Sequence, residues 1–156
     1  MRAFGRAATA LVAALGLASA VPASAETVLR VSMHSDLKII DPIWTTALIS
    51  ADHGYLVYDT LFALDETLTI KPQMIDKWEV SPDRLTWTFT LRAGLEWHDG
   101  AKVTAADCVA SIRRWGGKDG MGQALMSFTD TLEAIDDKSF RLKLKQPVGD
   151  DVFVIQ

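Results

Sequence analysis

The chain has 156 residues, of which 49% are hydrophobic, and its 20 acidic and 16 basic side chains give a formal net charge of −4. This acidic balance argues against nucleic acid and against an anionic membrane surface as partners. The single cysteine, Cys108, has no second thiol to pair with inside the chain. No disulfide framework can therefore hold the fold together, and its stability must come from a packed core.

The first 25 residues have the three parts of a secretion signal in the required order. Arg2 and Arg6 supply positive charge, an apolar run follows, and Ala23-Ser24-Ala25 offers small side chains to a signal peptidase. We therefore expect cleavage after Ala25. The alternative, an uncleaved membrane anchor, is disfavoured because the apolar run is shorter than the roughly 20 residues that span a bilayer.

The mode of export also follows from this segment. No cysteine follows the expected cut, where a lipid would be attached, and the two arginines are not adjacent as in a twin-arginine signal. The sequence thus predicts a soluble periplasmic protein that does not insert into the membrane after cleavage. We expect it to be a monomer.

The beginning of the mature chain predicts a strand, a turn and a helix. Residues 28–33 are mostly apolar and are expected to form a strand, which the turn at Asp41-Pro42 follows. A helix is expected over residues 45–61, where the apolar positions fall on one broad face. Gly54 weakens this helix because glycine has a low helix propensity.

A hairpin is expected next. One helical turn over residues 72–76 leads into a strand over 77–80, and residues 81–84 have the composition of a β-turn. The strand over 85–92 alternates apolar and polar residues, which is typical of a sheet with one buried face. The side chains expected to point inward are Leu85, Trp87, Phe89 and Leu91.

Two helices and a second hairpin complete the expected elements. Thr104 and Asp107 form a capping box at the start of a helix over residues 105–115. Glycines end this helix, and a short helix over residues 120–128 follows. The last hairpin pairs residues 131–135 with residues 140–145.

The motifs from Lys77 to Asp107 closely resemble the signature of bacterial extracellular solute-binding proteins of family five, which serve ABC importers. The matching elements are Trp78-Glu79, the turn at 81–84, Thr88-Phe89-Thr90-Leu91-Arg92-Ala93-Gly94, the aromatic Trp97, His98-Asp99-Gly100 and Thr104-Ala105-Ala106-Asp107. Asp41-Pro42 and Tyr58-Asp59-Thr60-Leu61 extend the match towards the start of the chain. Two departures are small: Thr60 replaces a common glycine, and Cys108 replaces an aliphatic residue.

The resemblance implies an α/β fold of the periplasmic binding protein type II class, in which two lobes close like a clam on a ligand. Residues 1–25 would be the signal peptide and residues 26–44 the first strand and loop of lobe I. Residues 45–156 would form the extra β-rich subdomain. The apolar, uncapped run over residues 152–155 suggests that this subdomain is truncated at its C-terminal end.

The resemblance also implies a function. The protein would be the periplasmic substrate-binding component of an ABC importer, binding a peptide-like or other small polar solute and delivering it to permease subunits at the inner membrane. No cofactor, metal or catalytic activity is expected. A non-functional truncated fragment is the alternative, and a small secreted hydrolase using His98 and Asp99 is a further one.

The candidate ligand-binding residues also come from the resemblance. The loop after the Asp-Pro turn reaches the ligand in relatives, and here it consists of Trp44, Thr45, Thr46 and Ala47. Threonine hydroxyls could bond the main chain of an extended ligand, but Thr45 or Thr46 could equally cap the following helix. Trp115 and Met121 are weaker candidates because a role in the core would also account for them.

Other residues that could carry chemistry have structural explanations. His98 and Asp99 precede Gly100 in a turn, where aspartate commonly bonds backbone amides. Trp78, Trp87 and Trp97 are expected in the core. Cys108 is expected to be a buried small hydrophobe rather than a reactive thiol. The histidines, His34, His53 and His98, lack the spacing of metal ligands.

Overall fold

The structure, a computed structural model, describes residues 28–148. The chain divides into two compact units, residues 1–32 and 33–156. The strand expected at residues 28–33 does not form: these residues have no regular structure and their side chains are exposed. A strand is stabilised only by pairing, and no described segment pairs with them. The predicted signal peptide lies outside the described residues.

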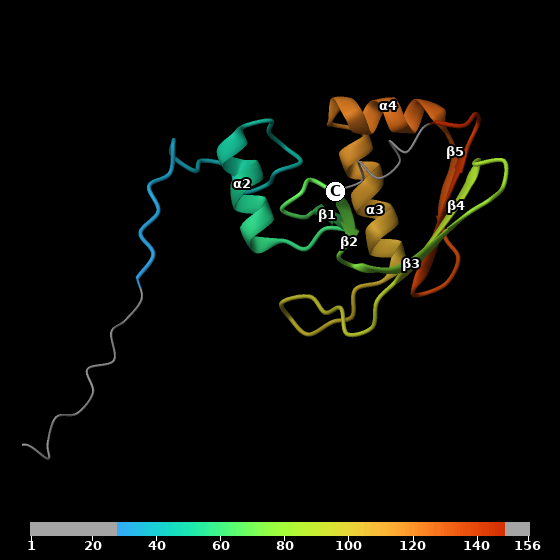
Figure 1. Ribbon diagram of the computed structural model, residues 1–156, viewed down its shortest axis with the longest axis horizontal. Coiled ribbons are helices and arrows are strands. Elements are labelled where there is room, and N and C mark those ends of the chain that lie inside the picture. The colour runs from blue at the N-terminus through green and yellow to red at the C-terminus, as the bar shows by residue number, and fades with distance from the viewer. Residues whose placement is uncertain (1–27, 149–156) are drawn as a thin grey trace, which may run out of the picture. The chain divides into compact units, whose positions relative to one another are not determined.

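The centre of the second unit is a four-stranded antiparallel sheet with the order β3-β4-β6-β5. Its strands are β3 (Ile75–Val80), β4 (Thr86–Leu91), β5 (Thr129–Ala134) and β6 (Ser139–Leu144). Both expected hairpins are confirmed, as β3 pairs with β4 and β5 with β6. Strand β4 also pairs with β6, which joins the two hairpins into one sheet, and Figure 1 labels β3, β4 and β5 of this sheet.

The buried face of this sheet is built from the alternating side chains of β4 and β6. Trp87, Phe89 and Leu91 are buried, as their spacing predicts, and Phe140 and Leu142 of β6 are fully buried opposite them. The Phe89 and Phe140 rings stack with centroids 5.0 Å apart. Alternation thus located the core correctly.

The prediction of a core role was wrong for two of the three tryptophans. Trp78 is 39% exposed and Trp97 46% exposed, whereas Trp87 is buried. Trp78 lies on an edge strand whose side chains after Ile75 are all exposed, although its ring still meets the Phe62 ring edge-on at 5.5 Å. Trp97 lies in a turn.

Helix α3 (Ala105–Gly116) covers the sheet with one apolar face, formed by Ala105, Cys108, Val109 and Ile112. Its start is as predicted. The Thr104 hydroxyl accepts a hydrogen bond from the Asp107 amide, and the Asp107 carboxylate accepts one from the Thr104 amide at 2.8 Å. These two bonds satisfy amides that the first helical turn leaves without partners.

Helix α4 (Gly120–Phe128) runs across the end of α3, as Figure 1 shows. The two helices can approach closely because glycines, Gly116 of α3 and Gly122 of α4, lie at their contact. A Cβ on Gly122 would lie 2.8 Å from the Trp115 carbonyl oxygen, and one on Gly116 would lie 2.4 Å from Met126 Cγ. No larger residue fits at Gly122 without moving backbone atoms.

A small hairpin, β1 (Phe62–Leu64) with β2 (Ile70–Pro72), was not predicted. The helical turn expected at residues 72–76 is wrong, because Pro72 ends β2 and Ile75 begins β3. The apolar and polar residues of so short a stretch do not distinguish a single helical turn from two strand ends.

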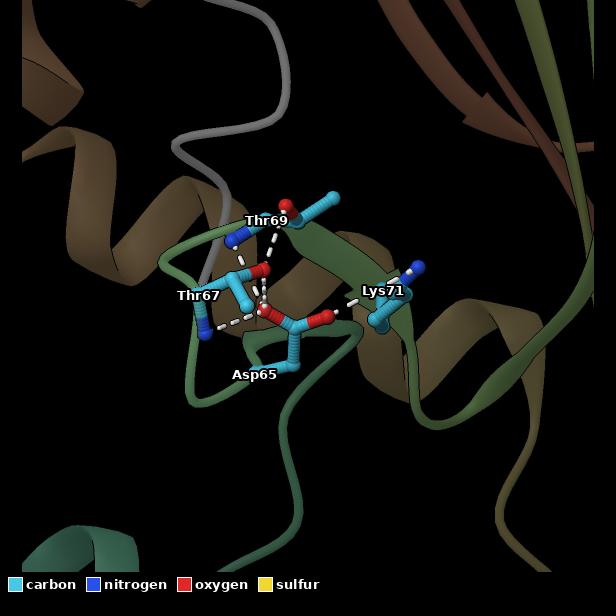
Figure 2. Close-up of polar contacts among 4 residues, drawn as sticks. All are labelled: Asp65, Thr67, Thr69 and Lys71. Carbon is cyan, nitrogen blue, oxygen red and sulfur yellow. Dashed lines mark hydrogen bonds and ion pairs between the residues drawn. The ribbon is translucent and has the colours of Figure 1, made fainter.

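The turn of this hairpin is organised by Asp65 (Figure 2). One carboxylate oxygen accepts hydrogen bonds from the Thr67 amide, the Thr67 hydroxyl and the Thr69 amide, at 2.9, 2.7 and 2.9 Å. Lys71 lies 3.7 Å from the other oxygen. These contacts, with the Thr67 hydroxyl first, lower the pKa of Asp65 to about 2.

Helix α2 (Leu48–Val57) is shorter than the helix expected over residues 45–61. It ends because Tyr58 adopts an extended backbone. Its apolar residues lie on all sides, so that Leu48, Tyr55 and Leu56 are largely exposed while Ile49 is buried. Among the described residues, no helix has the length and apolar character needed to cross a bilayer.

Candidate functional site

The candidate loop begins with a turn that Asp41 closes. The Asp41 carboxylate accepts a hydrogen bond from the Ile43 amide at 3.1 Å, and its carbonyl accepts one from the Trp44 amide at 3.2 Å. The Thr45 hydroxyl then accepts a bond from the Ala47 amide at 3.1 Å. The loop is therefore ordered by its own short polar side chains.

Neither candidate threonine caps the helix that follows. The residue at the N-cap position of α2 is Ala47, which makes no side-chain cap bond, and the Thr45 hydroxyl bonds the amide of Ala47 itself. The structural alternative to a ligand-binding role for Thr45 and Thr46, helix capping, is therefore wrong. Thr46 is exposed at the surface of the loop.

The loop is fixed to α2 through Pro42. A Cβ on Gly54 would lie 3.2 Å from Pro42 Cγ, so this glycine allows the proline ring to lie against the helix. The buried Ser50 hydroxyl of α2 donates a hydrogen bond at 2.5 Å to the carbonyl of Ile39, which precedes the loop. Gly54 weakens the helical pattern in the sequence and allows the close contact in the fold.

The same loop is fixed to α3 by an ion pair. Two nitrogens of the Arg114 guanidinium donate to the two carboxylate oxygens of Asp41, one of them at 3.2 Å. The Arg114 guanidinium is the main reason that the pKa of Asp41 lies below its usual range. A bidentate pair fixes orientation as well as distance, so the position of the loop relative to α3 is defined.

A second contact joins the loop to the turn between α3 and α4. Lys118 Nζ lies 4.4 Å from the centroid of the Trp44 ring, which is 61% exposed. This is the geometry of a cation–π interaction. The structure thus brings together two regions that the sequence identified separately, the loop at Trp44 and the glycine-rich stretch that follows Trp115.

The two weaker candidates in that stretch have different surroundings. Trp115 is half-buried and packs against the core. Met121 lies exposed in the first turn of α4, where its amide donates to the Asp119 carboxylate at 2.8 Å. Lys118, which sequence reasoning missed, is the residue of this region that meets Trp44. Its only signal in the sequence was its place in the glycine-rich stretch.

A cavity of about 380 Å³ lies beside this region. One wall is α3, with Cys108, Ile112 and Trp115, and the others are residues 57–61 and the turn at 95–98. The lining is mostly apolar, with Asp107 and His98 among its polar members. The helical spacing of α3 predicted a buried face but not that part of it would border a cavity.

Cys108 contributes a neutral thiol to this cavity. Its side chain is buried, and burial raises the pKa of the thiol to about 11. A thiol in this state is protonated at neutral pH and is a poor nucleophile. The prediction of a buried, unreactive cysteine agrees with this environment.

His98 and Asp99 occupy the turn that the sequence predicted. The Gly100 amide donates to the Trp97 carbonyl at 2.9 Å, and Gly100 has a φ of 83°, which favours glycine. The Asp99 carboxylate accepts a bond from the Ala101 amide at 2.9 Å. Asp99 therefore has a structural role in the turn. Within the described part of the chain, no three His, Cys, Asp or Glu side chains are grouped as a metal site.

Comparison with solved structures defines the class of fold. The chain superposes on Haemophilus influenzae OppA, solved in complex with the peptide RPPGFSPFR, with a TM-score of 0.64 and 26% identity. The match covers 72% of this chain and 26% of that one. The described region thus has the α/β architecture of part of a type II periplasmic binding protein, as the sequence predicted.

The family follows from the sequence match. Residues 69–156, more than half of the chain, match the family described as bacterial extracellular solute-binding proteins, family 5 middle. The chain belongs to this family. The resemblance inferred from the motifs between Trp78 and Asp107 is therefore confirmed.

Curated proteins with similar sequences are also named as binding proteins. The chain is 48% identical over 126 residues to the probable peptide ABC transporter periplasmic-binding protein y4tO of Sinorhizobium fredii, covering 81% of this chain and 24% of that protein. It is 32% identical over 141 residues to the glutathione-binding protein GsiB of Salmonella typhimurium, covering 87% of this chain and 28% of that protein. The chain spans about a quarter of the length of these relatives.

Proposed function

We propose that this chain is part of the substrate-binding component of an ABC importer, which binds a peptide-like or other small polar solute and delivers it to permease subunits at the inner membrane. The observation that carries the proposal is the 48% identity to a protein named as a probable peptide ABC transporter periplasmic-binding protein. Family membership supports it. In this proposal the protein is a monomeric carrier, and lobe closure completes the binding site.

The loop of Trp44, Thr45, Thr46 and Ala47 is the proposed ligand-binding surface of this part of the protein. Trp44 and Thr46 are exposed, and Thr45 and Thr46 do not cap α2. The ion pair between Asp41 and Arg114 gives the loop a defined position. A preformed loop loses less conformational entropy when a ligand binds, which favours affinity. Trp115 and Met121 are proposed as secondary contacts.

Export and a periplasmic location are part of the same proposal. The protein is proposed to be cleaved after Ala25 and released, since its first 25 residues have the order of a signal peptide. Mass spectrometry of the protein from a periplasmic extract would give a mature chain beginning at Glu26. A protein retained in the cytoplasm with Met1 intact would contradict this part of the proposal.

Calorimetry tests the binding function. We would express the complete reading frame and titrate the protein with trialanine, a nonapeptide, glutathione and a nickel–histidine chelate. Binding in the micromolar range or tighter by one of these solutes is expected. The double variant Thr45→Val, Thr46→Val should weaken it about tenfold, since two hydroxyls are lost. Failure of the wild-type protein to bind any of the four would overturn the proposed solute class.

The protein is proposed to act without catalysis. The rival hypothesis, a hydrolase using His98 and Asp99, requires turnover of the bound peptide. Incubating each solute with the protein and analysing it by mass spectrometry should recover it intact. Cleavage that disappears in the His98→Ala variant would support the hydrolase instead.

A further inference from the structure

The end of α3 and the turn after it carry three basic side chains, Arg113, Arg114 and Lys118, and two of them are engaged within the protein. The Arg114 guanidinium is paired with Asp41. Arg113, on the same helix, donates to the Leu132 carbonyl at 2.6 Å. Arg114 is thus paired with a carboxylate, and Arg113 is bonded to a carbonyl of β5.

Lys118 differs from both arginines. Its side chain is exposed, its ammonium lies 4.4 Å from the Trp44 ring centroid, and no carboxylate in the described part of the chain forms an ion pair with it. The adjacent carboxylate, Asp119, instead accepts bonds from the Met121 and Gly122 amides. An ammonium held over an aromatic face keeps hydrogen-bond donors for an incoming acceptor.

The position of this ammonium is defined on both sides. Lys118 follows Gly117, the C-cap residue of α3, and its amide donates to the Trp115 carbonyl at 3.0 Å. Trp44 is held by its own turn and by the bidentate pair between Asp41 and Arg114. The cation and the exposed ring are therefore presented together on a rigid surface.

We propose that Lys118 binds a carboxylate group of the transported solute, while the Trp44 ring contacts the apolar group next to it. This inference rests on the proposed function and specifies the solute class: a compound with a free carboxylate beside an apolar group, such as the C-terminal end of a peptide. An ammonium attracts a carboxylate, and the indole face accepts apolar surface.

The test compares acids with amides. We would express the complete reading frame and titrate it with trialanine and with trialanine amide, and likewise with glutathione and its glycyl amide. The wild-type protein should bind the acid form about tenfold more tightly than the amide. Lys118→Gln should reduce affinity for the acid by a similar factor and leave affinity for the amide nearly unchanged.

Two further variants complete the test. Lys118→Arg keeps a cation over the Trp44 ring and should restore the preference for the acid. Lys77→Gln removes an equal charge from the exposed strand β3 and should change neither affinity. The inference is overturned if the wild-type protein binds acid and amide equally, or if Lys118→Gln and Lys77→Gln have the same effect. If the wild-type protein binds none of the four probes, the proposed function fails first, and this inference with it.

Discussion

Two regions of the second unit are equally apolar in composition but are packed very differently. The sheet, α3 and α4 share a continuous core, in which Trp87, Phe140 and Leu142 are almost inaccessible to solvent. The loop and helix over residues 41–57 bury little: Leu56 is 80% exposed and Trp44 61% exposed. The buried residues of this region are Ile49, Ser50 and Gly54.

The difference follows from the distribution of polar residues. Strand β4 alternates threonine with apolar residues and therefore has one face for the core and one for solvent. Helix α2 has apolar residues on all sides, and its polar residues, Ser50, Asp52 and His53, do not form a separate face along its length. A helix that is apolar all round is suited to burial on more than one side. The sheet and the helices that cover it form a packed unit, whereas α2 presents a surface suited to further contacts.

The largest expected effect contrasts the two regions directly. Phe140→Ala removes a fully buried ring that stacks on Phe89, and should lower the free energy of unfolding by about 3–5 kcal/mol. Leu56→Ala removes an exposed side chain and should change it by less than about 0.5 kcal/mol. Urea unfolding followed by tryptophan fluorescence measures both. Equal effects would show that α2 is as well packed as the sheet.

A smaller effect is expected where α3 and α4 cross. Gly122→Ala places a Cβ 2.8 Å from the Trp115 carbonyl oxygen and should cost about 1–3 kcal/mol of unfolding free energy. Gly120→Ala is the matched control, because no atom lies within 4 Å of the added Cβ. Thermal unfolding of both variants would separate crowding from loss of glycine. If both unfold at the same temperature, the close approach of the helices is not maintained in solution.

A local effect is expected at the junction of the two regions. Arg114→Met removes the ion pair with Asp41, which is partly exposed and should contribute no more than about 1 kcal/mol to overall stability. Its main effect should be on the loop, where hydrogen exchange of the Ile43 and Trp44 amides should become faster. Lys77→Met, on β3, serves as the control. Unchanged exchange in the Arg114 variant would mean that the turn is held by Asp41 and Pro42 alone.

The smallest effect concerns pH. Asp65 has a pKa of about 2 in the folded chain against an ordinary value of 3.8, so folding favours its ionised form. Its contribution is therefore present above pH 3.8 and is lost as the pH falls through 2. Asp65→Asn should lower the melting temperature slightly at pH 6 and differ less from the wild type at pH 2, where about half of the Asp65 carboxylates in the folded chain are protonated. Glu66→Gln, next to it, should have no effect at either pH, and a constant difference for Asp65→Asn would contradict the assignment.

The fold could be predicted well where local signals agree. The capping box at Thr104, the turn at Gly100 and the alternation around Phe89 all gave the observed elements. The misses occurred where local signals were weak. Residues 28–33 are apolar but have no strand partner among the described residues, and residues 72–76 were too short for periodicity to identify.

The candidate site could be predicted only in part. The motif at Asp41-Pro42 pointed to the loop at Trp44, but nothing in the sequence indicated that Arg114 would hold that loop or that Lys118 would lie over the ring. These contacts join residues separated by more than 70 positions. Such pairs depend on the path of the whole chain between them, which local propensity does not specify.

The sequence by itself determined the family, most strands and helices, and the side chains that β4 turns towards the core, because motif spacing and periodicity are local properties. The tertiary structure decided which tryptophans are buried, which faces of α2 remain open, and which cation meets Trp44. Burial and pairing depend on what approaches a residue from elsewhere in the chain. The same apolar character therefore places Trp87 in the core and leaves Trp44 at the surface.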